Sequence, residues 1–532
     1  MGFIIAICVI LFLGCAFEAV LLLKDRGIVA EYVYKAEEMI ATDGWRCTIK
    51  RAFEIILGKT AGVRHLPTGK MEKEDGTLEI AVYPTGGMGD YIISSKILDE
   101  LMMYAPCRVT VFCEKPFFGN AIYGKRPDVV VKEYAGFEIE RNKYDLALMV
   151  EHFIHVLNMD DGRVEQIAPE LYRRMNYIRE NWNELYIRIP EQCFRERIRF
   201  ERCRVLGLDR WTELRMGQAF EIADKRTGIS LDMTEKEKFR QLDLIPGQYI
   251  TLNRGADSMR ANQEQLKVWP VEHYAELIQK IKETFAGLQI VQLGGKESEP
   301  LPGVDTAILG ESFELTKWII KKSCCHIDCE GGLVHLAVQM STPAVVVFGP
   351  TPLHMYGYEQ NFNLVDEQCN NCMGTHEDWA YRCYRGLEPR HRCMANVTPE
   401  RVLDACRQVV EQTAGRFKRL KKQEACNAVT AGKVALINEL DVTAYGINPD
   451  NSEIVVFSNR PDGRDAKVNC YKKQMEYRYS MPENLAYDSD AFDTVILGAY
   501  EDREEALAEA VRIVRTGGTV IVEGNRYEAI LE

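Results

Sequence analysis

From about residue 78 the chain alternates short apolar runs with longer amphipathic runs. Short apolar runs bounded by turn residues predict buried parallel strands, and the amphipathic runs between them predict helices. A first series of expected strands lies at 78–83, 107–114, 128–134 and 144–150. A second series has strands at 248–254, 288–295, 324–329 and 343–350, with helices over 271–285, 313–322 and 332–340. This alternation is typical of an α/β fold with parallel sheets.

Two such series of similar size predict two Rossmann-like domains that face each other, over residues 78–235 and 246–412. The charged stretch 159–215 predicts surface helices within the first domain. A third α/β region is expected over 430–532, after the basic segment 415–423. Ligands of open parallel sheets bind beyond the carboxyl ends of the strands, so the loops after the strands are where chemistry is expected.

The amino-terminal region, residues 1–70, has two interpretations. Residues 3–23 are long enough to span a bilayer, with Glu18 as their only charge. Basic residues follow this segment and none precedes it, so a spanning helix would leave the rest of the chain at the cytoplasmic face. The alternative is a β-α-β unit with turns at Gly14 and Gly27, which we favour because it also accommodates the glutamate. Both interpretations place the bulk of the protein in the cytoplasm.

Composition narrows the class of protein. A chain of 532 residues is too long to fold around one compact core. Its composition, with 46% hydrophobic and 27% charged residues, indicates an ordinary globular protein. The net charge of −13 argues against a general nucleic-acid binder, although a local basic pocket for phosphate stays compatible with it. The 17 cysteines are too sparse for a disulfide scaffold of this size and indicate a reducing compartment.

The first loop that could carry chemistry is PTGGMGDYIISS, residues 84–95. Gly86, Gly87 and Gly89 allow the backbone to turn tightly and approach a ligand closely. Asp90 then opens a helix, where it is either an N-cap or a general base at the strand-end cleft. The string is not the G-x-G-x-x-G pattern, so a nicotinamide site is not expected here.

The second loop, residues 253–270, brings cations near a glycine. Arg254, Arg260 and Lys267 with Gly255 would suit a diphosphate, because cations and free backbone N–H groups neutralise its charge. The competing interpretation is a solvated basic loop.

The third loop and helix, residues 329–352, begin with a glycine pair. Gly331 and Gly332 would leave the N–H groups of a helix start open to a phosphate. His335 follows on that helix, where it is either a ligand contact or a satisfied core histidine. Thr351 places a hydroxyl at the exit of the next strand.

Taken together, these loops resemble glycosyltransferase family 9, the bacterial ADP-heptose heptosyltransferases, which have the GT-B fold. The resemblance covers roughly residues 78–409 and is more specific in the second half. The motifs that carry it are Gly89-Asp90, Lys267-Val268-Trp269-Pro270, the run EGGLVHLA from Glu330 to Ala337, and the run STPAVVVFGPT from Ser341 to Thr351.

The resemblance implies an inverting transfer of a sugar from a nucleoside diphosphate sugar, which is ADP-linked in the family. The acceptor would be a hydroxyl of a glycan, a lipid-glycan or a protein. The process implied is the synthesis of bacterial surface glycans (lipopolysaccharide) or protein glycosylation. Asp90 would be the base and Lys267 would bind the donor phosphates. The implied donor site consists of Gly87, Gly89, Arg254, Gly255, Lys267, Glu297 (or Glu299), Glu330, Gly331, Gly332, His335 and Thr351. Catalysis requires no metal in this scheme, because protein cations and a helix N-terminus stabilise the leaving diphosphate.

This chain departs from the family at one motif. Glu330 stands where the family has Asp, and Gly331 where it has Ser or Thr. A longer acid and a lost hydroxyl alter the sugar contacts, so heptose is not assumed and another heptose or hexose stays open.

The cysteines Cys369, Cys372, Cys383 and Cys393 form the one dense thiol group. A C-x₂-C pair with two further thiols suits a structural zinc or iron site, and in the protein-glycosylating branch of the family four cysteines hold iron. The spacing of the second pair is not C-x₂-C, so free or paired thiols that fix a loop stay open as the alternative.

The segment 489–524 resembles the second half of a class I methyltransferase, but residues 432–441 lack a glycine-rich S-adenosylmethionine loop. We therefore expect an α/β domain without methyl transfer that docks a partner or the acceptor. Two alternatives to the glycosyltransferase stay open: a non-catalytic sugar-nucleotide-binding scaffold, and a bifunctional glycosyltransferase-methyltransferase. Membrane association and a homo-oligomer also stay open.

Overall fold

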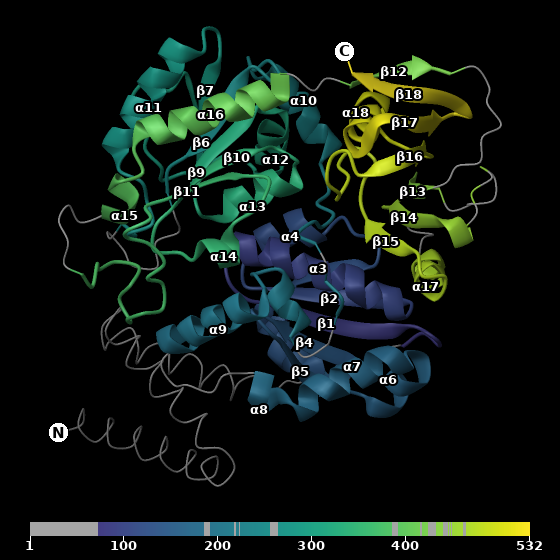
Figure 1. Ribbon diagram of the computed structural model, residues 1–532. Helices are drawn as coiled ribbons and strands as arrows, with labels where there is room; N and C mark the ends of the chain where they lie inside the picture. The colour runs from purple at the N-terminus through teal and green to yellow at the C-terminus, as the bar shows by residue number, and fades with distance from the viewer. Residues whose placement is uncertain are drawn as a thin grey trace, which may run out of the picture.

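The computed structural model describes residues 73–185, 192–216, 220–222, 224–255, 264–385, 392–414, 418–423, 432–439, 445, 447, 449–460 and 464–531. These residues build three sheets, here called sheets A, B and C, each covered by helices (Figure 1). The two interpretations of residues 3–23 concern a segment outside the described residues. Across the described ranges, no helix is both long and apolar enough to cross a membrane.

Sheet A has the strand order β3-β2-β1-β4-β5. Its first four strands in the chain run parallel, and β5 pairs antiparallel with β4 at the edge. The strands are β1 (Leu78–Pro84), β2 (Cys107–Cys113), β3 (Val129–Glu133), β4 (Leu146–Val150) and β5 (Ile154–Met159). All seven residues of β1 are buried, because helices cover one face and an aromatic cluster around Phe112 and Phe137 covers the other. A strand buried on both faces reads as a continuous apolar run, which explains why the sequence predicted it.

Helices surround sheet A and lead towards sheet B. Those beside the sheet are α3 (Met88–Tyr104), α4 (Pro116–Tyr123) and α5 (Phe137–Glu140). The charged stretch after β5 forms α6 (Asp161–Ile167), α7 (Pro169–Glu180), α8 (Trp182–Leu185) and α9 (Gln192–Leu206), which confirms the predicted surface helices. The helix α10 (Met233–Gln241) precedes sheet B.

Sheet B has the order β11-β10-β9-β6-β7-β8, and its neighbouring strands pair in parallel. Its strands are β6 (Tyr249–Asn253), β7 (Gln289–Gly294), β8 (Thr306–Leu309), β9 (Cys325–Cys329), β10 (Ala344–Phe348) and β11 (Phe362–Val365). One face packs on α11 (Val271–Thr284) and α16 (Pro399–Ala414). The other packs on α12 (Phe313–Lys322) and α13 (Gly332–Gln339), within an apolar core that continues into sheet A. Short helices α14 (Leu353–Tyr356) and α15 (Arg392–Ala395) follow β10 and β11.

Sheet C has the order β12-β18-β17-β16-β13-β14-β15, with β12 and β18 antiparallel to their neighbours. Its elements are β12 (Lys418–Lys422), β13 (Gly432–Ile437), β14 (Ser452–Ser458), α17 (Arg464–Lys472), β15 (Glu476–Tyr479), β16 (Phe492–Leu497), α18 (Arg503–Ile513), β17 (Val514–Val522) and β18 (Asn525–Leu531). The basic segment 415–423 thus supplies a lysine-rich edge strand, and charge on an edge strand opposes pairing with other chains.

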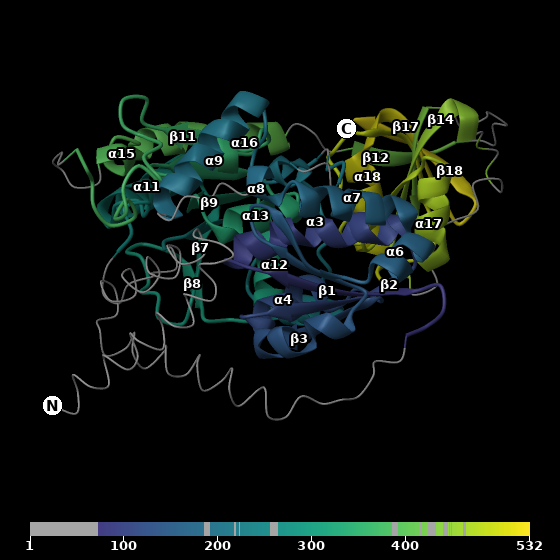
Figure 2. The ribbon, with the colours of Figure 1, turned by 90° about the horizontal axis from the view of Figure 1, so that it is seen from below.

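The three sheets contact one another through polar and apolar groups. Sheet C touches the sheet A unit where Lys467 pairs with Asp128 at 2.7 Å, and the sheet B unit where Lys321 pairs with Glu509 at 2.9 Å. Figures 1 and 2 show the sheet C unit beside α3, and Figure 1 also shows it beside α10, whose Lys236 pairs with Asp502. The predictions of an α/β class and of two Rossmann-like domains, the GT-B arrangement, are confirmed by sheets A and B.

Candidate functional site

Asp90 lies in the first turn of α3, where the chain leaves β1. Its Oδ2 accepts a hydrogen bond from the Gly87 backbone N–H at 3.0 Å. Gly87 is the N-cap of α3 and Asp90 is the third residue of the helix, so the prediction of Asp90 as the N-cap is wrong in position, although its side chain does bond a free N–H at the helix start. Gly86 has a φ of +94°, and a Cβ at that position would collide with the Asp90 carboxylate. A glycine is therefore needed for the loop to fold back onto the carboxylate.

The other oxygen of Asp90 is held by Arg210, a residue that the sequence did not single out. Asp90 Oδ1 accepts from Arg210 Nη2 at 2.8 Å and from Arg210 Nε at 3.3 Å. Arg210 is 1% exposed and Asp90 is 32% exposed, so the pair lies at the wall of a partly open site. Burial alone would raise the pKa of Asp90, but the Arg210 guanidinium and the Gly87 N–H outweigh it and hold that pKa below its usual value. Asp90 is therefore ionised at neutral pH.

Arg210 is in turn fixed from behind by buried groups. Its Nη1 donates to Glu213 Oε1 at 3.1 Å, and Glu213 also lies 2.6 Å from His152 Nδ1 and 3.5 Å from Arg199 Nε. Burial raises the pKa of Glu213 to about 7 despite the two guanidinium groups. Burial also holds the pKa of His152 well below its usual value, so His152 is neutral and shares one hydrogen bond with Glu213 through Nδ1. The network presents the guanidinium to Asp90 in one orientation.

His335 on α13 is buried, and its tautomer follows from its neighbours. Trp211 Nε1–H donates to the Tyr358 hydroxyl at 2.8 Å, so that hydroxyl turns its own proton to His335 Nδ1, 2.5 Å away. Nδ1 is then the acceptor and the ring proton sits on Nε2, which lies 4.0 Å from Glu330 Oε1. Burial holds the pKa of His335 below its usual value, although Glu330 and Asp90 oppose this. A neutral ring thus offers an Nε2–H donor.

The loop of sheet A and the glycine helix of sheet B touch each other. A Cβ on Gly89 would lie 2.5 Å from His335 Cδ2, and a Cβ on Gly332 would lie 2.5 Å from the end of Met88. The helices α3 and α13 therefore meet at their amino ends with no room for side chains at these glycines. Two motifs separated by about 240 residues in the sequence form one site.

Lys267 joins this site through its anchored neighbour Trp269. The Trp269 side chain is fully buried, and its indole N–H donates to the Val397 carbonyl at 2.8 Å. Its backbone N–H donates to Cys329 Sγ at 3.2 Å, which holds the loop against the end of β9. Lys267 Nζ consequently lies 3.7 Å from Glu330 Oε2, with the lysine side chain 20% exposed.

The remaining predicted donor residues are distributed around the ends of the sheet B strands. Arg254, which follows β6, pairs with Glu264, and its buried Nε has no hydrogen-bond partner within the described part of the chain. Thr351 is 4% exposed, and its Oγ1 has no partner among the residues that the structure describes. Gly255 and Glu297 are exposed in the loops after β6 and β7. Arg260 lies outside the described residues.

The four clustered cysteines are neighbours, but they do not form a ready ligand set. Burial raises the pKa of Cys372 to about 11 and that of Cys393 to about 12, and the other thiols of the cluster add to both shifts. Over the described ranges, no three His, Cys, Asp or Glu side chains are arranged to hold a metal ion. As they stand, the thiols do not fit the predicted zinc or iron site, so no step of the chemistry is assigned to a metal.

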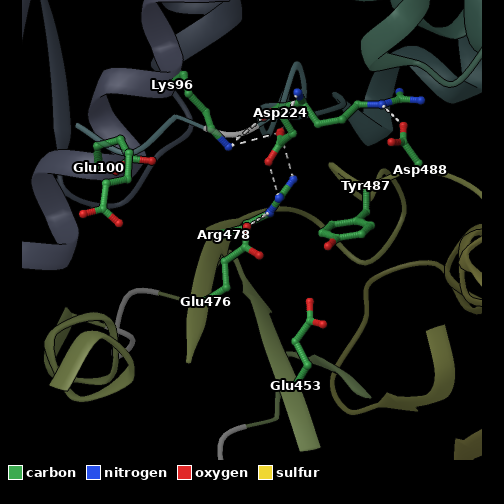
Figure 3. Close-up of a pocket in the computed structure, with 10 residues that line it drawn as sticks. Lys96, Glu100, Asp224, Glu453, Glu476, Arg478, Tyr487 and Asp488 are labelled. Carbon is green, nitrogen blue, oxygen red and sulfur yellow. Dashed lines mark hydrogen bonds and ion pairs between the residues drawn. The ribbon is translucent and has the colours of Figure 1, made fainter. Parts of the chain in front are cut away.

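A separate cavity of about 440 Å³ lies between α3, the segment before α10 and sheet C (Figure 3). Six carboxylates and three cations line it with one tyrosine: Lys96, Glu100, Glu221, Asp224, Arg226, Glu453, Glu476, Arg478, Tyr487 and Asp488. Burial raises the pKa of Glu100 to about 7, and the nearby carboxylates of Asp224 and Glu476 add to it. Such an acidic lining repels a diphosphate. None of the predicted donor-site residues lines this cavity, so it is not the predicted donor site.

The comparisons with known proteins concern mainly the sheet B side of this site. Residues 195–380 match the family model of glycosyltransferase family 9 (heptosyltransferase). The match identifies this region as a family 9 glycosyltransferase region, and the prediction of a glycosyltransferase is confirmed at that level. The matched region contains Arg210, Lys267 and the Glu330–His335 stretch, but it begins after Asp90. No curated protein matches the chain.

Solved structures of the same class are similar to this chain at low identity. A family 9 glycosyltransferase from Veillonella parvula is 14% identical over 65% of this chain and 100% of its own, with a TM-score of 0.42. The E. coli ADP-heptose LPS heptosyltransferase II is 16% identical over 63% of this chain and 100% of its own, with a TM-score of 0.39. The iron-containing dodecameric glycosyltransferase TibC from enterotoxigenic E. coli is 11% identical over 64% of this chain and 80% of its own, with a TM-score of 0.42. The strand order and pairing of sheets A and B, rather than these low scores, define the fold.

Proposed function

We propose that this protein is an inverting glycosyltransferase that moves a sugar from a nucleoside diphosphate sugar, ADP-linked, to a hydroxyl acceptor. The observation that supports it best is the meeting of the Asp90 loop with the glycine start of α13, where Gly89 packs on His335. An ionised carboxylate on one side then faces a helix N-terminus and a lysine on the other. The donor would lie on the sheet B side and the acceptor on the sheet A side.

Asp90 is the proposed general base. Oδ1 accepts two bonds from Arg210 and Oδ2 accepts one from the Gly87 N–H, so a lone pair stays available on Oδ2 of a carboxylate whose orientation is fixed. The acceptor hydroxyl gives its proton to Asp90 as its oxygen attacks the anomeric carbon, and the bond to the diphosphate breaks. General-base assistance contributes roughly 10²–10⁴ in rate. The Arg210 pair makes Asp90 a weak base, so its contribution lies at the lower end of that range.

The departing diphosphate needs positive groups, and the sheet B side supplies them. Lys267 Nζ, the N–H groups at the start of α13 and the Nε2–H of His335 are all close to Glu330 or to the Gly331–Gly332 turn. Arg254 and the Thr351 hydroxyl would add contacts with polar atoms that have no hydrogen-bond partner in the described chain. Such preorganised donors act where charge develops in the transition state, so no metal is needed for this step.

The identity of the sugar depends on Glu330. This carboxylate is 8% exposed and lies between Lys267 and His335, so we propose that it accepts hydroxyl groups of the transferred sugar. Its side chain is one methylene longer than the Asp of the family, which favours a sugar seated further from α13. ADP-D-β-D-heptose, which is bound in a solved complex of TibC, is the first donor to test.

Transfer to water tests the base without knowledge of the acceptor. ADP release from ADP-heptose, or from an ADP-hexose, would be followed for the wild type, for Asp90→Asn and for Asp90→Ala, with donor affinity measured in parallel by calorimetry. We expect both variants to lose at least about tenfold in ADP release while they keep the wild-type donor affinity. Near-full turnover in both variants would show that Asp90 is not the base.

The scaffold alternative is favoured by one contact, the Lys267–Glu330 ion pair, which neutralises the lysine needed by the diphosphate. Glu330→Gln separates the two functions. A transferase that uses Glu330 for the sugar would lose turnover in this variant, whereas a site closed by Glu330 would gain donor affinity.

The remaining assignments are proposals of the same kind. We propose domain limits of 78–235, 246–412 and 430–532, and a third domain that holds the other two in place rather than transferring methyl groups. At the carboxyl end of β13, the Asn438 side chain already donates to the Asn459 side chain and to the Ala499 carbonyl, which occupies the edge where a methyl donor would bind. A structural metal at the cysteines, a homo-oligomer and a cytoplasmic location stay predictions.

A further inference from the structure

The acidic cavity of Figure 3 lies where two units of the fold meet. The helix α3 of the sheet A unit forms one wall with Lys96 and Glu100, and strands β14 and β15 of sheet C form another with Glu453, Glu476 and Arg478. Its volume of about 440 Å³ lies in the range of sites that hold small molecules, roughly 300–1,000 Å³. A ligand bound here would be separate from the proposed donor site, because none of the predicted donor residues lines the cavity.

The cations of the lining are buried in its walls and already paired. Lys96, Arg226 and Arg478 are 4%, 6% and 4% exposed. Lys96 Nζ donates to Asp224 Oδ1 at 3.4 Å and to the Arg226 carbonyl at 3.1 Å. Arg226 Nε donates to Asp488 Oδ1 at 2.9 Å, and Arg478 pairs with Asp224. The lining residues therefore offer no free cation to an anionic ligand.

The carboxylates of the lining are not all balanced. Six carboxylates face three cations, and two of the six pair with cations from outside the lining: Glu221 with Arg174 at 3.1 Å, and Glu453 with Lys433. Glu100 has neither an ion-pair nor a hydrogen-bond partner among the residues that the structure describes, and no dashed line reaches it in Figure 3. The cavity thus contains one carboxylate whose charge is uncompensated.

The surroundings of Glu100 favour a positive partner. Lys96 lies one turn earlier on α3, within reach of a helical ion pair, but its ammonium is bonded to Asp224 instead. Burial raises the pKa of Glu100 to about 7; Lys96 opposes this shift, and the carboxylates of Asp99, Asp224 and Glu476 add to it. An unpaired carboxylate removed from water is unfavourable, and an opposite charge beside it stabilises the ionised form. A cation that enters the cavity would gain most next to Glu100.

We propose that this cavity binds a small organic molecule through a primary ammonium group placed against Glu100. An ammonium group donates charge-assisted hydrogen bonds to a carboxylate, and Tyr487 gives the rest of the ligand an aromatic wall on the sheet C side. A bare metal ion fits less well, because the described residues contain no group of three His, Cys, Asp or Glu side chains arranged to hold one. The volume exceeds that of an ammonium group alone, so the ligand is an amino sugar or an alkyl diamine, which share this chemistry.

Calorimetric titration of the full chain distinguishes these two sources of the ammonium group. The probes are glucosamine and putrescine, and each is compared with a neutral counterpart of similar shape, glucose and butanediol. We expect one amine to bind at least about tenfold more tightly than its neutral counterpart, because the counterpart lacks the charge-assisted hydrogen bond to Glu100. The amine that binds identifies the class of ligand.

The variant Glu100→Gln tests the proposed contact, because it keeps the shape of the side chain and removes its charge. Amine affinity should fall at least about tenfold. Folding should not suffer: the folded pKa of Glu100 is raised above its usual value, so its ionised form destabilises the fold as the pH rises through about 7. The unfolding midpoint of Glu100→Gln at about pH 8 should therefore equal or exceed that of the wild type. The matched control is Glu237→Gln, at a carboxylate on α10 that is 63% exposed, and it should leave amine affinity unchanged.

Proton release gives a readout that non-specific amine binding lacks. An ammonium group beside Glu100 lowers the pKa of that carboxyl, so binding near pH 7 drives off the proton that part of the Glu100 population carries. The wild type should release about half a proton per ligand more than Glu100→Gln does. The number of protons is obtained from the binding enthalpy in buffers that differ in ionisation enthalpy.

Three results would overturn the proposal. The first is no binding of either amine at millimolar concentration, and the second is equal binding of an amine and its neutral counterpart. The third is amine binding by Glu100→Gln that matches the wild type in affinity and proton release. No nucleotide sugar enters these experiments, so failure here leaves the proposed function untouched.

Discussion

Replacement of Arg210 by Gln should cost both stability and base function, because this guanidinium neutralises two carboxylates from a buried position. At 2.8 Å and an effective dielectric constant of about 20, the Coulomb attraction between Arg210 and Asp90 is about 6 kcal/mol. Desolvation of Arg210 and the 32% exposure of Asp90 reduce the net coupling, to about 1.5–3 kcal/mol. Arg210→Gln as a single change should cost more, about 3–5 kcal/mol, because Glu213 also loses one of its buried partners.

A double-mutant cycle measures the coupling itself. The free energy of unfolding would be obtained by denaturant titration for the wild type, Asp90→Asn, Arg210→Gln and the double variant. The control is the same cycle on Glu170 and Arg173, whose side chains are 35% and 63% exposed at a similar distance of 2.7 Å. That exposed pair should give at most about 1 kcal/mol. A coupling of less than about 0.5 kcal/mol between Asp90 and Arg210 would refute the reasoning.

Arg210→Gln should also change the pH dependence of ADP release. Because the folded pKa of Asp90 lies below its unfolded value, the stabilisation from its ionised form is fully present above about pH 4 and is lost as the pH falls through the folded pKa. Without Arg210, burial becomes the dominant effect and raises the pKa of Asp90. The acidic limb of the pH–rate profile for ADP release should therefore move to higher pH in Arg210→Gln. An unchanged limb in a folded variant would show that Arg210 does not set the ionisation of the base.

Three further predictions concern the groups around the site. Tyr358→Phe removes the hydroxyl that donates to Nδ1 of His335, so it should lower kcat for ADP release several-fold with little change in the unfolding midpoint. An unchanged kcat would contradict the assigned tautomer. Burial raises the pKa of Asp224, but Lys96 and Arg478 outweigh it and lower that pKa to about 2, which predicts stabilisation that is present above about pH 4 and lost towards pH 2. Arg478→Met should weaken this dependence, as followed by circular dichroism, because Lys96 remains. Elemental analysis of protein purified without chelator should give about one zinc or iron per chain if the cysteines rearrange to bind a metal, and Cys372→Ser should abolish it; a metal-free wild type would rule the site out.

The strands and helices of sheets A and B could be predicted because buried parallel strands and amphipathic helices leave strong local patterns. β1 ends one residue beyond the predicted apolar run, and α3 ends within a residue of its predicted end but begins at Met88, before the Asp90 that was expected to open it. The edge strands β5, β8, β11 and β12 were not predicted, because an edge strand is half exposed and β12 reads as a basic linker in sequence. Pairing with a distant strand, rather than a local preference, decides their structure.

The site was predictable only in its glycine and lysine motifs. Arg210 and Tyr358 complete it, yet nothing in their sequence neighbourhood distinguishes them from other arginines and tyrosines. Their roles arise from tertiary contacts across about 120 residues to Asp90 and across 23 residues to His335. One local signal was available for Arg210: a buried arginine requires a carboxylate partner, and Glu213 follows it by three residues.

The most direct test of the central claim is calorimetric titration of the purified protein with ADP-heptose, and with GDP-, UDP- and CDP-sugars for comparison, for the wild type and for Lys267→Ala. The account predicts that one nucleoside diphosphate sugar, ADP-linked, binds the wild type and that Lys267→Ala weakens it at least about tenfold, since a charge-assisted contact with a phosphate is lost. The Asp90→Asn variant should bind that donor as the wild type does. No binding of any nucleotide sugar, or equal binding by Lys267→Ala, would contradict the account.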